Sequence, residues 1–152
     1  SRYWGSKEKL FAAAMKLPFD PATAVPELAA PGLEGMGERL TRATLDTLSD
    51  EESREDLLVL FKAGASSTKA TAGLRAFIEQ SMIDRLVRYI GVPDARLRVS
   101  LISSYLVGIA ANRYITRLEP LASMPEDDLV KIVAPTIQAW LDPSIPLPGG
   151  VA

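Results

Sequence analysis

The chain has 152 residues, 47% of them hydrophobic, which is enough for one compact domain with a buried core. It contains no histidine and no cysteine, which excludes disulfides, thiolate nucleophiles, histidine bases and the commonest transition-metal ligands. A formal net charge of −2 argues against a broad nucleic-acid surface, so any contact with DNA has to be local.

Nothing in the sequence predicts a membrane protein. The N-terminus does not resemble a signal peptide, and the apolar run of residues 99–111 is shorter than the ~20 residues that a bilayer span requires. We therefore expect a cytoplasmic protein without a membrane partner. No cofactor, metal site or catalytic cluster is predicted.

The first predicted helix covers residues 7–16. Ser6 is a suitable N-cap, Glu8 lies in the first turn, and Leu10 and Phe11 begin an apolar face. Lys7 lies beside the free backbone N–H groups of the helix start, where a phosphate oxygen can bind. An ordinary capped helix with solvated lysines accounts for the same residues.

The run Tyr-Trp-Gly-Ser-Lys-Glu at residues 3–8, with Leu10 and Phe11, closely resembles the end of the DNA-binding domain in tetracycline-repressor (TetR) family regulators. The resemblance implies that Tyr3 and Lys7 contact DNA phosphates. Ser1 departs from the aromatic residue that many members have, and the preceding helices are missing, so this chain alone is not expected to present a helix-turn-helix to DNA. Residues 1–17 are interpreted as the end of the DNA-binding domain and a connecting helix.

Prolines and glycines divide the next part of the chain. Pro18 and Pro21 precede at most a short helix at residues 22–29, and a further helix is predicted at 33–48. Asp50 is expected to cap the following helix, which ends or is interrupted at 64–67. The acidic residues at 51, 52, 55 and 56 are interpreted as solvated charge at a helix N-terminus, because no histidine completes a catalytic or metal site.

Two long helices follow, at about 69–89 and 97–118. The second is uncharged between Val99 and Ala111 and has a bulky face and a stripe of small residues. The bulky face comprises Leu101, Ile102, Tyr105, Leu106 and Ile109, and the small stripe comprises Ser100, Ser104, Gly108 and Ala111. Such a helix needs cover on both sides, which predicts pairing with a second copy; a central core helix of a monomer is the alternative.

The last predicted helix begins at Pro125, and Pro135 is expected to bend it near Lys131. Residues 143–152 are predicted to form a flexible tail. The Pro-Phe-Asp-Pro segment at 18–21 and the segments at 118–122 and 133–135 also resemble one actinobacterial-type branch of TetR C-terminal domains. The resemblance thus extends over nearly the whole chain.

This resemblance implies an all-α, TetR-like C-terminal domain of roughly six helices that dimerises through a four-helix bundle. Residues 18–142 would be the ligand-binding and dimerisation domain. The residues that would line the ligand pocket are Phe61, Phe77, Met82, Tyr105, Ile109 and Asn112. Those of the dimer interface would be Ser104, Gly108, Ala111, Ile115, Ile137 and Trp140.

The leading hypothesis is a ligand-responsive TetR-family transcriptional regulator, a repressor, that is not an enzyme. Its partners would be a second copy of the chain, operator DNA and a small-molecule effector that the sequence does not identify. The competing hypothesis is a helical dimerisation or adaptor module without DNA binding. A small helical enzyme is a third reading, but no suitable cluster of Asp, Glu, Lys, Ser or Tyr supports it.

Overall fold

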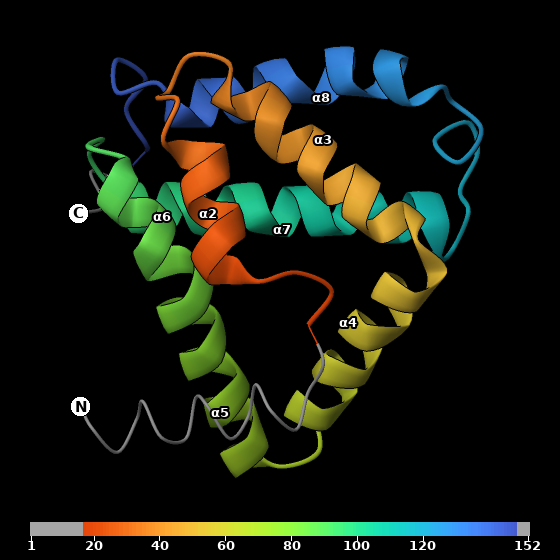
Figure 1. The fold of residues 1–152 in the computed structure, drawn as a ribbon. Coiled ribbons are helices and arrows are strands. Elements are labelled where there is room, and N and C mark those ends of the chain that lie inside the picture. Colours follow the sequence, from red (N-terminus) through yellow and green to blue (C-terminus); the bar gives the residue numbers. More distant parts are fainter. Residues whose placement is uncertain (1–16, 149–152) are drawn as a thin grey trace.

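The computed structural model describes residues 17–148, and within them every regular element is helical (Figure 1). Predicted site residues Tyr3 and Lys7, and the first predicted helix, lie outside this range. The elements are α2 (Pro21–Ala29), α3 (Met36–Ser49), α4 (Glu51–Gly64), α5 (Thr68–Ile78), the π-helical turn η1 (Glu79–Ile83), α6 (Asp84–Tyr89), α7 (Ala95–Tyr114) and α8 (Glu126–Leu141). The prediction of an all-α domain is confirmed.

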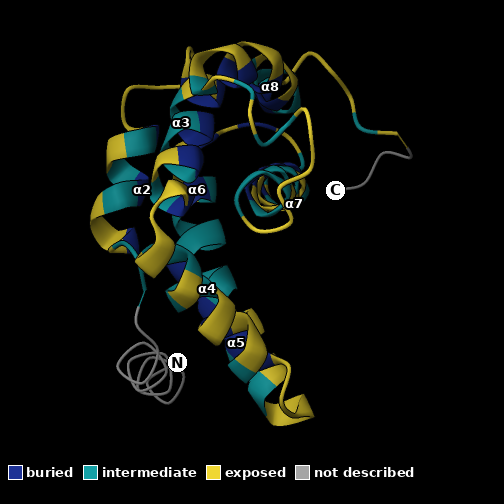
Figure 2. Cartoon of the chain, turned by 90° about the vertical axis from the view of Figure 1, so that its right-hand side faces the viewer, coloured by how far each residue is buried: buried dark blue, intermediate teal, exposed yellow. Residues whose placement is uncertain are grey.

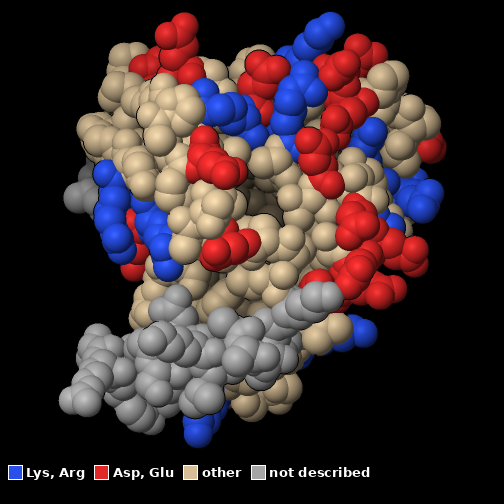
Figure 3. Space-filling view, viewed as in Figure 1, with Lys and Arg blue, Asp and Glu red and all other residues tan. Residues whose placement is uncertain are grey.

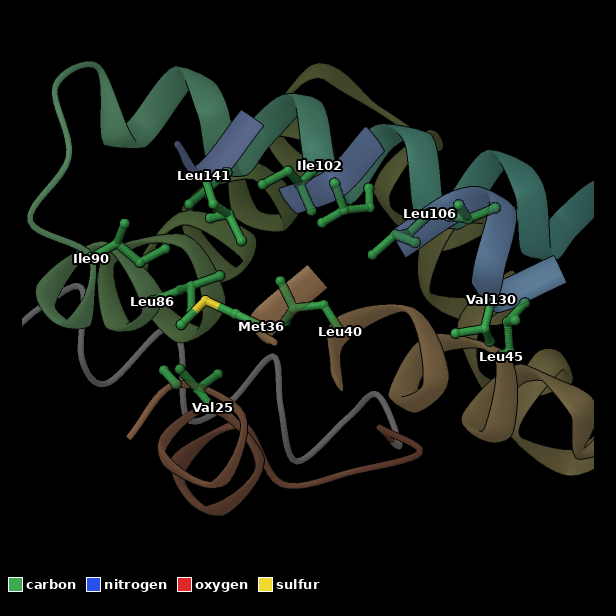
Figure 4. Packing of buried hydrophobic residues seen from close by; sticks show 14 of the residues in the cluster. Val25, Met36, Leu40, Leu45, Leu86, Ile90, Ile102, Leu106, Val130 and Leu141 are labelled. Carbon is green, nitrogen blue, oxygen red and sulfur yellow. The ribbon is translucent and has the colours of Figure 1, made fainter. Parts of the chain in front are cut away.

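The core lies between α3, α7 and α8, with α2 and α6 closing one end (Figure 1). Met36 is completely buried at the start of α3, and Leu40 follows one turn later (Figure 4). From α8, Leu129, Val133 and Ile137 point into the same core at four-residue spacing. The apolar stripes of three helices therefore share one core.

Helices α4 and α5 form a hairpin that projects from this body (Figure 2). Helix α4 packs mainly against α3 and α5, and its Arg54 guanidinium lies over the Tyr114 ring at the end of α7. Gly64 allows the close approach of the hairpin's two arms, because a Cβ atom there would lie 2.2 Å from Cδ2 of Leu74. The predicted break at residues 64–67 is the turn of this hairpin.

Polar caps define several helix starts. Asp50 Oδ2 accepts a hydrogen bond from the amide of Ser53 at 2.9 Å, as the sequence predicts, and Asp20 caps α2 in the same way. α8 continues through Pro135, so this proline does not end the helix. α7 ends at Tyr114, earlier than the predicted range of 97–118.

The single helix predicted at residues 69–89 contains an irregularity. Between α5 and α6 the backbone forms η1, in which the amide of Asp84 donates to the carbonyl of Glu79, five residues earlier. Each element follows directly on the last, so α5, η1 and α6 form one continuous rod, and the described residues contain six helical rods. No local pattern in the residues predicts this wider turn.

Arg98 anchors the segment that follows α8. Its guanidinium is 1% exposed and donates to the carbonyl oxygens of Trp140, Asp142 and Ile145, and Nε donates to that of Pro93. The beginning of the segment predicted to be a flexible tail is therefore held against α7. Across residues 17–148, no helix is both long enough and apolar enough to cross a membrane.

Candidate functional site

A cavity of about 310 Å³ lies beside the start of α2. One wall is the segment that leads into α2, which is red in Figure 1, and the other is the rod formed by α5, η1 and α6. Its lining is mostly apolar, with an arginine, a serine and an aspartate: Leu17, Phe19, Asp20, Pro21, Ala22, Phe77, Ser81 and Arg85. A concave apolar site with a few polar groups is the usual form of a small-molecule site.

The rod contributes three residues at four-residue spacing. Phe77 comes from α5, Ser81 from η1 and Arg85 from α6. A regular α-helix turns every 3.6 residues, so positions four apart drift around its surface. The wider π-helical turn between Phe77 and Arg85 reduces this drift and keeps the three side chains on one side of the rod. Such turns are frequent at functional sites.

The wall formed by the segment that leads into α2 is shaped by two prolines and by Asp20. Pro18 and Pro21 hold the chain out of helical geometry until α2 begins. Asp20 Oδ1 accepts from the amide of Ala22 at 3.1 Å, and Oδ2 accepts from the hydroxyl of Thr23 at 3.2 Å. The carboxylate that lines the cavity is thus engaged with the start of α2.

Arg85 is the cation of this cavity. Its Nε atom is buried without a hydrogen-bond partner, and the guanidinium makes no ion pair with a described residue. Acidic side chains gather instead over the first half of α4, on the right of Figure 3, whereas basic side chains lie over α6 on the left. The cavity therefore contains a positive charge that forms no ion pair with a described residue, although the carboxylate of Asp20 also lines the cavity.

A larger hollow, of about 550 Å³, lies between α3 and α8. Several of its polar groups are already used, since Arg42 contacts Asp127 at 2.9 Å and Glu38 at 3.1 Å. The amide of Gln138 accepts from Gly37 N and donates to Leu33 O, both at 2.8 Å. This hollow is a less suitable ligand site than the cavity beside α2.

The outward face of α7 is uncharged and partly apolar. Leu101 is 37% exposed, Val107 38% and Ile115, directly after the helix, 46%, with exposed Ser104 and Gly108 between them. In Figure 2 α7 is seen nearly end-on, with exposed residues along one side. An uncharged face with several exposed apolar side chains is typical of a protein interface.

Comparison with known proteins identifies the family. Residues 34–141 match the family model described as "Tetracyclin repressor-like, C-terminal domain". The chain belongs to the TetR family. A crystal structure of a TetR-family regulator from Streptomyces coelicolor A3 is also similar, with 34% sequence identity and a TM-score of 0.62 over 91% of this chain and 93% of that chain. A search of curated proteins gave no significant match.

Membership of the TetR family makes this chain part of a transcriptional regulator and points away from an enzyme. In the described part of the chain, no group of three or more acidic side chains is arranged to hold a metal ion. The predicted ligand and interface residues all lie within the described part of this TetR-family domain.

Of the predicted ligand residues, Phe77 lines the cavity beside α2, whereas the other five do not. Phe61 is 44% exposed on α4. Tyr105 and Ile109 pack against the core, and the Tyr105 ring meets that of Trp140 edge-on with 5.5 Å between centroids. The remaining two are partly buried: Met82 lies in η1, and Asn112 accepts a hydrogen bond from the Thr116 hydroxyl.

The predicted interface residues divide into two groups. Ser104, Gly108 and Ile115 are exposed, and Ala111 is partly exposed on the same outward face of α7. Trp140 is half-buried against Tyr105. The prediction that Ile137 lies at the dimer interface is corrected here. Ile137 is 0% exposed in the chain's own core and has no surface to offer a partner.

Ser81 and Arg85 are the cavity residues that sequence reasoning missed. Their four-residue spacing after Phe77 is visible in the sequence, but an arginine on a helix that also carries Asp84 and Arg88 is not unusual. The alignment of these positions depends on η1, which has no sequence signature. The second wall, at residues 17–22, could not be placed opposite them from sequence alone.

Proposed function

We propose that this domain senses a small molecule and controls DNA binding by a homodimeric TetR-family repressor. The observation that carries this proposal is the cavity between the entrance to α2 and the rod of α5, η1 and α6. It has the apolar lining and the few polar groups of a ligand site. Its first lining residue, Leu17, directly follows the segment in which Tyr3 and Lys7 are proposed to contact DNA phosphates.

The packing of the helices supports a route from the cavity to the proposed interface. α2 packs against η1 and α6, and both η1 and α6 pack against α7. A ligand that separates residues 17–22 from the rod would shift α6 relative to α7. It would also displace the start of α2, and with it the chain that leads to the DNA-binding segment.

The outward face of α7 is proposed as the main dimer contact. Small residues at Ser104, Gly108 and Ala111 allow close approach of a second helix, and Leu101 and Ile115 supply apolar area. On α8, exposed Ile132, at 59%, is a better contact candidate than the buried Ile137. Together α7 and α8 of two copies would form the four-helix bundle.

In this mechanism the ligand acts through its different affinity for two arrangements of the dimer. Only such a difference can shift the equilibrium, and a change from 1:99 to 99:1 requires a preference of about 10⁴-fold. DNA affinity would come mainly from phosphate contacts and would fall steeply with salt. The ligand would favour the spacing of the two DNA-reading units that does not match the operator.

The experiment is a footprint of the full-length gene product on the DNA that flanks its own gene. We expect protection of a palindrome that weakens as the salt concentration rises, and release by a subset of small molecules. Ala22→Trp places a bulky side chain at the cavity lining, and we expect it to abolish release while protection persists. Ala30→Trp, at an exposed position just after α2, is the matched control and should respond normally.

Absence of protection at low salt by a folded dimer would contradict the proposal and favour the helical adaptor hypothesis. Normal release from Ala22→Trp would place the effector elsewhere in the domain. A mass in solution that corresponds to a monomer at micromolar concentration would contradict the dimeric arrangement.

A further inference from the structure

We propose that the ligand of the cavity beside α2 is a monocarboxylate with a flat or extended hydrophobic body. Its carboxylate would pair with Arg85, and its body would pack against Leu17, Phe19 and Phe77. The inference rests on the proposed function, since it names the chemical class that this cavity would sense.

Arg85 lacks the hydrogen-bond partners that comparable arginines have. Within residues 17–148, every other arginine that is not exposed donates at least one hydrogen bond to a carbonyl or a carboxylate, namely Arg39, Arg42, Arg54, Arg98 and Arg113. Arg85 makes none with a described residue, and its Nε atom is buried. Since a guanidinium stays protonated and a buried unpaired donor is costly, this site favours an anion.

The charged residues of the lining limit the charge of the ligand that the cavity can accept. Arg85 is the cavity's one basic residue among the described lining residues, and the carboxylate of Asp20 lines it as well. Both Asp20 oxygens are held by α2, through Ala22 N and the Thr23 hydroxyl, rather than by Arg85. A dianion such as a phosphate monoester would meet only one cation and would be repelled by Asp20, whereas a single carboxylate matches the planar guanidinium.

The rest of the lining suits a ligand with a hydrophobic body. Apart from Asp20, Ser81 and Arg85, the described lining is apolar, and Phe19 and Phe77 contribute aromatic rings from opposite walls. A volume of about 310 Å³ is in the range of small-molecule pockets. The site therefore suits an amphiphilic acid more than a small inorganic or highly hydroxylated anion.

The test compares acids with their neutral amides on the full-length protein by isothermal titration calorimetry. The probe pairs are 2-naphthoate with 2-naphthamide and octanoate with octanamide, which differ in the charged group alone. We expect at least one acid to bind about tenfold or more tightly than its amide, as charge-assisted hydrogen bonds allow. Arg85→Gln should remove this preference, and Arg85→Lys should retain part of it.

Arg88→Gln is the matched control, because Arg88 is an exposed arginine on the same helix. It should bind the probes like the unmodified protein, and circular dichroism melts verify that each variant is folded. Equal binding of acid and amide, no binding of either acid at millimolar concentration, or equal losses from Arg85→Gln and Arg88→Gln would overturn the inference.

The same samples separate this inference from the proposed function. If amides and acids bind equally and both release DNA in the footprint, ligand sensing stands and the preference for an acid is wrong. If acids bind through Arg85 but DNA protection does not change, the preference for an acid is supported and the sensing proposal fails.

Discussion

The backbone amide of Gly37 donates a hydrogen bond to Oε1 of Gln138, with 2.8 Å between the two atoms. The other end of the same amide side chain donates to the carbonyl of Leu33 at 2.8 Å. One side chain of α8 thus satisfies a free amide at the start of α3 and a carbonyl of the preceding loop. This contact fixes how the two most extensively packed helices of the domain cross.

Gly37→Ala is expected to destabilise the domain by about 1–3 kcal/mol, the usual cost of overpacking. A Cβ atom at this position would lie 2.6 Å from the carbonyl oxygen of Ala134 and 2.9 Å from the amide of Gln138. Backbone atoms cannot rotate away, so α3 and α8 would have to separate. Urea unfolding measures the effect, with Gly91→Ala as the control, because its Cβ would meet open space. Equal stability of the two variants would contradict the proposed packing constraint.

Much of the fold could be predicted because its boundaries depend on local chemistry. Pro21 begins α2, Asp50 caps α4, and Gly64 ends it, each for a backbone reason visible in the sequence. The TetR signature then supplied the arrangement of these helices. These parts required no knowledge of which residues meet across the core.

The orientation of faces was harder to predict. Ile132 and Ile137 both lie on α8, yet Ile132 is 59% exposed and Ile137 is 0% exposed. Periodicity finds an apolar stripe but does not tell a chain's own core from a partner's surface. Leu101 likewise belonged to the bulky face in the sequence and is 37% exposed. The cavity depends on a π-helical turn and on two segments about 60 residues apart, neither of which leaves a local pattern.

Arg98→Met is expected to lower the free energy of unfolding by about 2–4 kcal/mol, because it leaves several partly buried carbonyl groups without a donor. Arg98 Nη1 donates to Trp140 O at 2.9 Å and holds the segment after α8 against α7. Arg96→Met is the control, since Arg96 pairs with Asp84 and Glu79 at the surface, where an ion pair is worth about 0–1 kcal/mol. Denaturant unfolding checks both variants. A similar small loss in both would show that Arg98 does not anchor the segment.

Gly108→Arg is expected to convert the proposed dimer to a folded monomer. A Cβ atom at position 108 would meet no other part of the same chain, so the domain itself should fold normally. At the proposed interface the arginine would be buried without a partner, which should weaken dimerisation more than about tenfold. Sedimentation equilibrium gives the dissociation constant. Ser103→Arg is the control, because Ser103 is exposed on α7 but lies off the stripe of Ser104 and Gly108. A dimeric Gly108→Arg protein would exclude this face as the contact.

Glu126→Gln is expected to make the domain less sensitive to pH and more stable near pH 7. The pKa of Glu126 is raised above its ordinary value, chiefly by a hydrogen bond with Asp46 and further by burial and by the Asp46 charge, against the opposing effect of Arg42 and Arg113. The folded state therefore binds the proton more tightly than the unfolded state, and the stability gained from it is lost as the pH rises through the folded pKa. A glutamine side chain can donate a hydrogen bond to Asp46 at any pH, so this contact no longer depends on protonation of residue 126.

Thermal melts from mildly acidic to neutral pH measure this effect as the slope of stability against pH. Asp128→Asn removes a negative charge from the same first turn of α8, which favours such charges. It is the matched control and should lower stability slightly without flattening the slope. A steeper fall in stability with rising pH for Glu126→Gln than for the unmodified chain would contradict the contribution of the Glu126–Asp46 hydrogen bond. The same slope in both proteins would place the titration on another group.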